Sequence, residues 1–350
     1  MLAEHDVVER VASQQEDRLG RGRRALERRA YAEPMLDAES LLRGSTRPLV
    51  VGMGGGGDVV GALATAEFAR LYDGAAPVLG GLAWERRPID PVPGPRRIDE
   101  IAGAEQLAPA VLLAGPLTRV RERDVFFAES RMAEFLGEPT VLIDVSTGPA
   151  TIADSIATAS SSLGCDLVAF IDVGGDVLAR GDEAGLRSPL CDAVMLAVAA
   201  HLHRAGRPVL AGVFGIGCDA ELLPSEVLAR MAEVAAAGGL IGARGLTKPV
   251  AERLEQAIAV VPTEASAQAV RAFRGASGSV PIRGGARTVE LSSVAALTFY
   301  LDVEATIHAV GRLAAAVDGA NSLEEANAAL GAIGVSTELD LERAATAASL

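Results

Sequence analysis

Three features are scarce in this 350-residue chain, and each scarcity excludes a class of protein. The three cysteines, Cys165, Cys191 and Cys218, are far apart, so the chain encodes neither a disulfide framework nor a CxxC zinc site. Its single lysine, Lys248, lies in GLTKP rather than in GxxxxGK[ST], which excludes a P-loop NTPase. No apolar run approaches the ~18 residues of a membrane span, and the first residues lack the apolar core of a signal peptide. We therefore expect a cytoplasmic protein that does not bind membranes.

The chain also has few basic residues relative to acidic ones. The 32 basic residues are outnumbered by 46 acidic ones, and the net charge of −14 argues against nucleic acid as a partner. One local exception, residues 18–29, carries six arginines and is interpreted as a solvated helix or tail. With 49% hydrophobic and 22% charged residues, the chain has the composition of a globular protein of one large or two smaller α/β domains.

Short apolar runs bounded by glycine alternate with amphipathic stretches after residue 45. This alternation predicts an α/β fold, a doubly wound, mostly parallel, Rossmann-like sheet with helices on both faces. The strands are expected at 49–52, 78–83, 110–114, 140–145, 166–173 and 208–214. The helices are expected at 59–72, 123–136, 150–163, 190–204 and 224–237. Residues 88–95, PIDPVPGP, must form a loop because proline does not fit a central strand or a helix interior.

Three regions are expected along the chain. Residues 1–45 are predicted to form an N-terminal helical arm and linker, residues 46–240 the Rossmann-like core, and residues 241–350 a C-terminal α/β portion packed on that core. The C-terminal portion contains a glycine-serine loop at 275–287, an apolar run at 294–301 and an amphipathic region at 323–347.

Glycine and aspartate recur where the predicted strands end. The six segments in chain order are GMGGGGD, GGLAWE, AGPLTR, DVSTGP, DVGGD and FGIGCDAE. Because parallel strands share one carboxyl edge, where ligands bind in doubly wound folds, we expect these loops to form a site. Glycine suits such loops because it permits a positive φ and a close approach of the backbone to a ligand.

The first of these loops contains four successive glycines, Gly54, Gly55, Gly56 and Gly57, followed by Asp58. Gly52, Gly54 and Gly57 satisfy GxGxxG between a predicted strand and a predicted helix, which indicates a phosphate, nucleotide or carboxylate site at the helix start. Asp58 would repel a pyrophosphate there, and no acidic residue stands where a dinucleotide site expects one, about 20 residues on. Two other interpretations stay open: a dinucleotide site, and a structural turn capped by Asp58.

The second motif is IDVGGD, in which Asp172 ends a predicted strand and Asp176 follows Gly174 and Gly175. Two carboxylates in one small volume suit Mg²⁺, or a general base beside a sugar hydroxyl. The alternative is that Asp172 accepts bonds from neighbouring amides and Asp176 caps a turn. A larger set of strand-end carboxylates is expected on the same edge: Asp58, Asp144, Asp172, Asp176 and Asp219. Such crowding favours a metal or a polyhydroxylated ligand.

Other side chains are weaker candidates. Ser146 and Thr147 would donate hydrogen bonds to a phosphate or a sugar, or cap a helix. Arg283 lies in a loop that could close over an anionic substrate, and Arg271, Arg274 and Arg287 flank the same loop. Cys218 is a candidate nucleophile without a nearby histidine in the sequence. Each cysteine is followed by aspartate, which we interpret as a coincidence.

Four motifs together resemble a family of archaeal and actinobacterial proteins of unknown function. They are GMGGGGDVVGAL, IDVGGDVLARGDEAGLRSPLCD, GVFGIGCDAELLP and SLEEANAALGAIGVSTELDLER, and the resemblance spans most of the chain after residue 45. It implies no reaction and no substrate.

The sequence thus predicts an enzyme for a small anionic or polyhydroxylated metabolite, phosphorylated or similar to a nucleotide or sugar, acting by transfer or hydrolysis. Gly54–Gly57 would bind the anion, and Gly174, Gly175, Ser146, Thr147 and Arg283 are further candidates for binding the substrate. Asp172 and Asp176, with Asp58, would bind Mg²⁺ or act as general base. The alternatives are an NAD(P)-dependent oxidoreductase and a regulatory module that binds a nucleotide or metabolite without catalysis. A homo-oligomer is compatible with all three.

Overall fold

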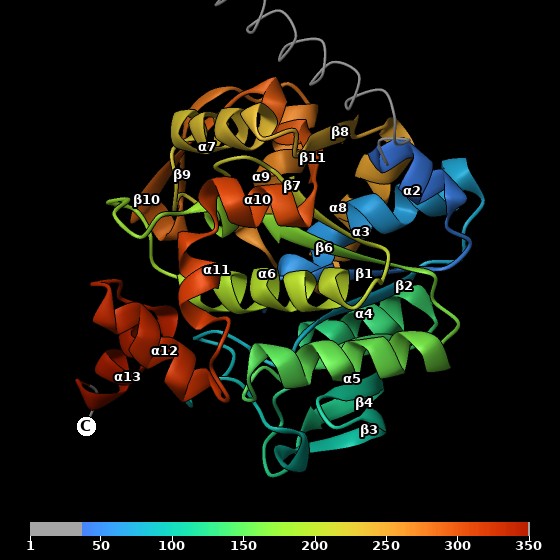
Figure 1. Ribbon diagram of the computed structural model, residues 1–350, viewed down its shortest axis with the longest axis vertical. Coiled ribbons are helices and arrows are strands. Elements are labelled where there is room, and N and C mark those ends of the chain that lie inside the picture. The colour runs from blue at the N-terminus through green and yellow to red at the C-terminus, as the bar shows by residue number, and fades with distance from the viewer. Residues whose placement is uncertain (1–36, 349–350) are drawn as a thin grey trace, which may run out of the picture. The chain divides into compact units, whose positions relative to one another are not determined.

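Five parallel strands form the centre of the sheet in the computed structural model, which describes residues 37–348 (Figure 1). They are β1 (Pro48–Gly52), β2 (Val78–Leu82), β5 (Thr140–Ile143), β6 (Leu167–Val173) and β7 (Val209–Phe214). Their order in the sheet is β5-β2-β1-β6-β7, so the chain builds outward in one direction from β1 and then crosses over to build in the other from β6. This is the doubly wound order, and β1 and β6 flank its switch point.

Antiparallel strands extend the sheet on both sides, to nine strands in the described part of the chain. β4 (Val111–Val120) and β3 (Ile101–Ala108) lie beyond β5, while β11 (Leu297–Leu301) and β8 (Leu240–Gly245) lie beyond β7. The prediction that AGPLTR ends a parallel strand is therefore wrong. Residues 114–119 continue β4, which runs antiparallel to β5, because β3 provides hydrogen-bond partners for their backbone.

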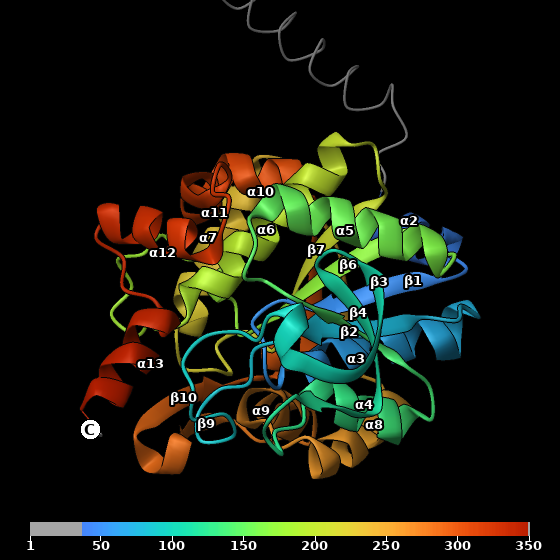
Figure 2. The ribbon, with the colours of Figure 1, turned by 90° about the horizontal axis from the view of Figure 1, so that it is seen from below.

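Helices cover both faces of the sheet, as predicted (Figure 2). α5 (Pro149–Ser162) and α6 (Pro189–Arg204) pack on one face, whereas α3 (Asp58–Phe68) and α4 (Ala128–Leu136) pack on the other. Leu49 and Val51 of β1 belong to the first core and Val50 to the second. A central strand that is buried on both sides must be apolar throughout, which explains the uninterrupted apolar runs in the sequence.

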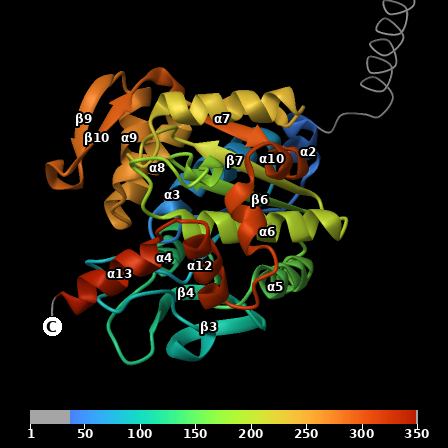
Figure 3. The ribbon, with the colours of Figure 1, turned by 60° about the vertical axis from the view of Figure 1, so that its left-hand side comes forward.

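The C-terminal third adds helices and a hairpin. α7 (Pro224–Ala236) precedes β8, and α8 (Lys248–Val260) and α9 (Glu264–Phe273) follow it. The glycine-serine segment expected to be a loop forms a hairpin of β9 (Gly278–Ile282) and β10 (Arg287–Leu291), because its residues pair in antiparallel register. Helices α10 (Val303–Val310), α11 (Arg312–Val317), α12 (Leu323–Ala332) and α13 (Glu338–Ala347) complete this part. The hairpin and α13 lie toward the same end of the strands (Figure 3), but Ile282 of the hairpin belongs to the second core and Leu339 of α13 to the first.

Residues from Ala38 onward form one compact unit, with α2 (Ala38–Gly44) at its start. Residues 241–350 contribute β8 and β11 to the central sheet. The arginine-rich segment at 18–29 lies outside the described residues. As predicted, residues 88–95 contain neither helix nor strand. A helix long and apolar enough to cross a bilayer is absent from residues 37–348.

Candidate functional site

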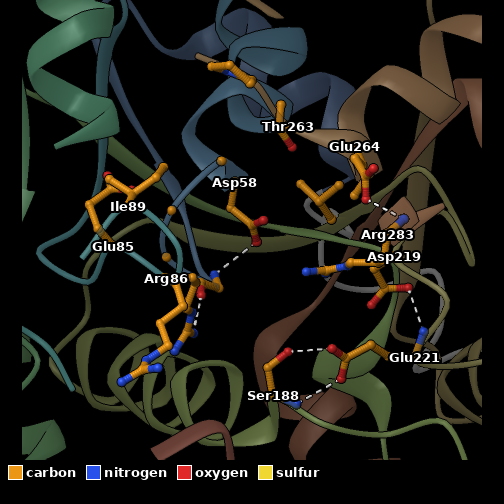
Figure 4. A pocket seen from close by; sticks show the side chains of 18 of the residues that line it. Asp58, Glu85, Arg86, Ile89, Ser188, Asp219, Glu221, Thr263, Glu264 and Arg283 are labelled. Atoms are coloured by element: carbon orange, nitrogen blue, oxygen red, sulfur yellow. Dashed lines mark hydrogen bonds between the residues drawn. The ribbon is translucent and has the colours of Figure 1, made fainter. Parts of the chain in front are cut away.

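A cavity of about 380 Å³ lies at the carboxyl ends of β1 and β6 (Figure 4). Segments that are distant in the sequence line it: the glycine loop after β1, residues 85–89 after β2, the ends of β6 and β7, the starts of α6 and α9, and the tip of the β9–β10 hairpin. Its volume suits a small metabolite. The cavity therefore occupies the switch point of the sheet, where the sequence placed a site.

Asp58 closes the glycine loop on itself. It is the first residue of α3, and its Oδ2 accepts a hydrogen bond of 3.0 Å from the amide of Gly54. The amide of Gly56 donates to the carbonyl oxygen of Trp84, so the loop is also tied to the chain after β2. Burial, together with the negative charge of nearby Asp172, raises the pKa of Asp58 to about 8. Asp58 is thus a part of the loop and also faces the cavity.

Two amides of the glycine loop remain free for a ligand. Within the described residues, the amides of Gly55 and Gly57 have no hydrogen-bond acceptor. Gly55 has a φ of +79°, which glycine adopts without strain. The loop therefore offers two unpaired donors, as the anion-binding interpretation of Gly54–Gly57 expects, beside a carboxyl group that a dinucleotide site would not contain.

Three buried carboxylates converge below this loop. Asp172 lies near the end of β6, Asp176 follows it, and Asp192 lies in the first turn of α6. One oxygen from each lies within 4.8 Å of the others, and the three residues are 1%, 5% and 2% exposed. Neither oxygen of Asp172 has a hydrogen-bond partner, nor has Oδ1 of Asp192. Buried carboxylates in this condition are costly unless they bind protons or a cation.

The pKa values of these groups reflect their burial. Burial raises the pKa of Asp172 to about 7, although the side chain of Asp176 and the amides of Gly175 and Val177 oppose the rise. Burial also raises the pKa of Asp176 and Asp192 well above the usual range, and the carboxylates around them add to the effect. A divalent cation among the three would reverse these shifts, because it favours the charged forms.

A second group of acids adjoins the first but already has partners. Asp176, Asp219 and Glu221 also bring one oxygen each within 4.8 Å of one another. Glu221, however, accepts hydrogen bonds from the amide and hydroxyl of Ser188 and from the amide of Arg187. Glu221 therefore already has three hydrogen-bond donors, whereas Asp172 in the first group has none.

Gly174 permits the close packing of these acids. Its φ is +127°, and a Cβ atom at this position would lie 2.3 Å from Cγ of Asp219. Any other residue would be strained and would displace Asp219. The double glycine at 174–175 thus serves the geometry of the carboxylates, whereas the sequence suggested that it binds substrate.

Arg86 is the main cation fixed in the wall of the cavity. Its Nη2 donates to the carbonyl oxygen of Gly54, and its guanidinium stacks 4.1 Å from the centre of the Trp84 ring. Two glutamates of α13 hold it from behind, with Glu338 at 3.4 Å and Glu342 at 3.6 Å. Arg86 therefore connects the glycine loop to the C-terminal helix.

Glu338 also fixes the start of α6. Its carboxylate accepts hydrogen bonds of 2.9 Å from the amides of both Leu190 and Cys191. These residues directly precede Asp192, so α13 stabilises the turn that places this carboxylate. A negative charge at a helix N-terminus is itself favourable.

Glu85, which also lines the cavity, is engaged elsewhere. It is buried, its Oε1 accepts a hydrogen bond of 2.5 Å from the amide of Ala128, and burial raises its pKa to about 7. It is the acid nearest to the end of β2, but it is not free to accept bonds from a ribose as in a dinucleotide site.

Asp144, Ser146 and Thr147 do not join this cavity. They line another one, of about 730 Å³, between the end of β5 and helices α12 and α13. Asp144 is fully partnered there, because Oδ2 accepts from the amide of Ile98 and Oδ1 from the amide of Ser146. The prediction that all five strand-end carboxylates share one site is wrong for Asp144, since two backbone amides satisfy it locally.

Among the predicted arginines and the candidate nucleophile Cys218, only some lie at the main cavity. Arg283 lines the main cavity, whereas Arg274 pairs with Glu255 on the surface and Arg271 donates to Gln268. Cys218 is fully buried, and burial together with Asp219 raises the pKa of its thiol, so it is not prepared to act as a nucleophile.

Comparison with protein families matches residues 49–346 to a family described as a protein of unknown function, DUF1152. The chain belongs to this family. The resemblance to a family without an established activity is thereby confirmed. Comparison with curated proteins and with solved structures finds no match.

Sequence reasoning missed four residues of the candidate site: Arg86, Ser188, Asp192 and Glu221. Arg86 lies in an irregular segment without a motif, and Ser188 lies within the motif that runs from Ile171 to Asp192 but has no strand-end position that would single it out. Asp192 and Asp219, however, are two of the three aspartates that follow a cysteine, a repetition interpreted above as a coincidence. Both lie in the site, so the repeated Cys-Asp pair was the available signal for Asp192.

Proposed function

We propose that this protein is an enzyme that binds a divalent cation, Mg²⁺ or Mn²⁺, and uses it to act on a small anionic metabolite by transfer or hydrolysis. The observation that carries the proposal is Asp172, a nearly fully buried carboxylate with no hydrogen-bond partner, which lies within ligand distance of Asp176 and Asp192. Hard divalent cations prefer such carboxylate oxygens.

The balance of charge supports a cation. Seven acidic side chains line the cavity, namely Asp58, Glu85, Asp176, Asp192, Asp219, Glu221 and Glu264. Asp172 lies directly beside two of them, Asp176 and Asp192. Arg86 is held by Gly54 and the glutamates of α13, and Arg287 lies 3.6 Å from Glu221. Since neither arginine pairs with Asp172, Asp176 or Asp192, a metal ion is the simplest counter-charge for these three.

The residues around the cation have distinct roles in this proposal. Asp172, Asp176 and Asp192 hold the ion, which would polarise a substrate oxygen. The free amides of Gly55 and Gly57 face the anionic part of the substrate. Asp58, which lines the cavity and has one oxygen held by Gly54, is the group placed to give or take a proton at the reacting atom.

Turnover tests this proposal. The full chain is incubated with Mg²⁺ or Mn²⁺ and a panel of sugar phosphates, nucleotides and other phosphate esters, and product is measured with and without EDTA. We expect metal-dependent turnover that Asp172→Asn lowers at least ~100-fold, because loss of even an outer partner of a metal site costs about 10- to 100-fold. Asp144→Asn is the matched control and should retain activity. Metal binding without any turnover would instead identify a regulatory module.

An NAD(P)-dependent oxidoreductase is the second candidate. Gly52, Gly54 and Gly57 satisfy GxGxxG between β1 and α3, which favours it. Asp58 at the helix start and the engaged Glu85 count against it. A thermal shift with NAD(H) or NADP(H) would support this candidate, and the absence of a shift with all four forms would end it.

A further inference from the structure

The tip of the β9–β10 hairpin presents one arginine to the cavity. Arg283 follows β9, lines the cavity beside Ile282, and extends toward its middle between Asp58 and Asp219 (Figure 4). No ion pair joins Arg283 to any acid in residues 37–348, although several carboxylates surround the cavity. Arg86, on the opposite wall, is by contrast engaged with Gly54, Trp84 and Glu338. Arg283 is thus the cavity arginine whose side chain is uncommitted.

The backbone at Arg283 is strained. Its φ is +53°, in the left-handed region, and Gly284 and Gly285 follow with φ of +64° and +90°. The turn consists of three successive residues with positive φ, and the first is the one that carries a side chain. An L-residue in this region is less stable than glycine, and such strain concentrates at functional sites.

The tip is also held in place from a second element. Oε2 of Glu264, the first residue of α9, accepts a hydrogen bond of 2.7 Å from the amide of Arg283, and Ile282 is buried beside it. The backbone of Arg283 is therefore fixed relative to the cavity while its guanidinium is free. This arrangement suits a residue that must meet a ligand in one position.

We propose that Arg283 binds the anionic group of the substrate, and that this group is a phosphate monoester which also contacts the metal ion. The inference rests on the proposed function, since it assigns the substrate class of the same site. A phosphate group has three terminal oxygens, and the cavity offers three kinds of partner for them: the guanidinium of Arg283, the free amides of Gly55 and Gly57, and a cation on Asp172 and Asp176. Guanidinium binds phosphate through paired, charge-assisted hydrogen bonds.

Calorimetric titration of the full chain tests this assignment with Mn²⁺ and inorganic phosphate as probes. We expect wild type to bind phosphate in the presence of Mn²⁺. Arg283→Ala and Arg283→Gly should bind phosphate at least ~10-fold more weakly with unchanged Mn²⁺ affinity, because a charge-assisted bond is lost. Arg283→Lys should retain part of the affinity. Arg274→Ala removes a surface arginine of the same region and should behave as wild type.

Thermal denaturation separates a binding role from a structural one. Arg283→Gly removes the strain together with the side chain, so its Tm should equal or exceed that of wild type while phosphate binding is lost. A Tm well below wild type for Arg283→Gly would overturn the inference, because it would show that the side chain holds the hairpin.

The remaining outcomes are also decisive. Unchanged phosphate affinity in Arg283→Ala, with Mn²⁺ binding intact, overturns this inference and leaves the proposed function standing. If Arg283→Ala binds Mn²⁺ more tightly and phosphate as well as wild type does, Arg283 only neutralises the carboxylates, and the inference is wrong. If wild type binds acetate as tightly as phosphate, the site does not select phosphate, and the inference is also wrong. If wild type binds no Mn²⁺, the proposed function fails. The inference about Arg283 is then tested by titrating phosphate without metal, and it stands only if wild type binds phosphate and the Arg283 variants do not.

Discussion

Asp144 and Asp172 occupy matching positions in the sequence and opposite situations in the structure. Each lies in the tripeptide Ile-Asp-Val at the end of a buried parallel strand, at the same edge of the sheet. Asp144 accepts hydrogen bonds from two backbone amides, whereas Asp172 accepts none. The fold itself thus provides hydrogen-bond donors for the Asp144 carboxylate, whereas the Asp172 carboxylate requires a proton or a ligand as its partner.

The residue two positions further along explains the difference. After Asp144, the amide of Ser146 turns back and donates to Oδ1 at 2.8 Å. After Asp172, the corresponding amide of Gly174 donates instead to the carbonyl oxygen of Phe214 at the end of β7. The neighbouring parallel strand therefore takes the amide that would have satisfied Asp172. A carboxylate becomes available to a ligand here because the backbone is engaged elsewhere.

Metal affinity should separate the two aspartates most strongly. Asp172→Asn removes a direct ligand, so we expect Mn²⁺ affinity measured by calorimetry to fall at least ~100-fold. Asp144→Asn should leave this affinity within about twofold, since Asp144 lies in another cavity. Equal heats for wild type and Asp172→Asn would contradict the proposed metal site.

The pH dependence of stability should be next in size. Without metal, Asp172 and Glu85 titrate near pH 7 and Asp58 near pH 8 in the folded protein, but near pH 4 when unfolded. Between these values the folded state holds protons that the unfolded state releases, so the free energy of unfolding falls by several kcal/mol as pH rises from about 4 to about 8.

Denaturant titrations at a series of pH values, in EDTA and with saturating Mn²⁺, measure this dependence. The cation favours the ionised carboxylates, so Mn²⁺ should flatten the fall, and its affinity should rise with pH up to about 8. Asp172→Asn should reduce the slope in EDTA, whereas Asp144→Asn should not. Stability in EDTA that is constant or rises from pH 5 to 8 would be incompatible with buried, unpartnered acids.

The same two substitutions should change the stability of the metal-free protein in opposite directions. At pH 8 Asp172→Asn removes an unpartnered buried charge and should raise the free energy of unfolding or leave it unchanged. Asp144→Asn weakens two hydrogen bonds to a charged acceptor and should lower it by about 1–3 kcal/mol. Chemical denaturation in EDTA measures both, and a large loss for Asp172→Asn would mean that Asp172 has a structural partner.

Glu338→Gln should have the smallest effect on Mn²⁺ affinity, because Glu338 does not contact the metal site and only positions Asp192 and Arg86. The amide side chain binds the α6 amides and Arg86 more weakly than the carboxylate does, so Asp192 and Arg86 should be less well fixed. We expect Mn²⁺ affinity to fall about 10-fold or less. Glu324→Gln, which disturbs only a surface pair with Arg343, is the control and should match wild type.

The sequence predicted most of the fold because the central strands are apolar runs with clear ends. It identified those residues of the candidate site that follow a strand directly, as with Gly54–Asp58 and Asp172–Asp176. It did not predict Asp192, because helix α6 carries it to the cavity, and it passed over Glu221, although Glu221 lies in the same loop after β7 as Asp219. Nor could it distinguish Asp144 from Asp172. That distinction depends on which acceptor the amide two residues further along finds, and Phe214 is 40 residues away from Gly174 in the chain. Likewise, the sequence did not predict that residues 278–291 pair into a hairpin, because their three glycines and one proline are typical of a loop.

Anomalous diffraction from crystals grown with Mn²⁺ tests the central claim most directly. We predict a manganese peak within bonding distance of Asp172, Asp176 and Asp192, with both oxygens of Asp144 still held by Ile98 and Ser146. The absence of a peak at these three residues at saturating Mn²⁺, or an Asp172 carboxylate hydrogen-bonded to protein donors alone, would contradict it.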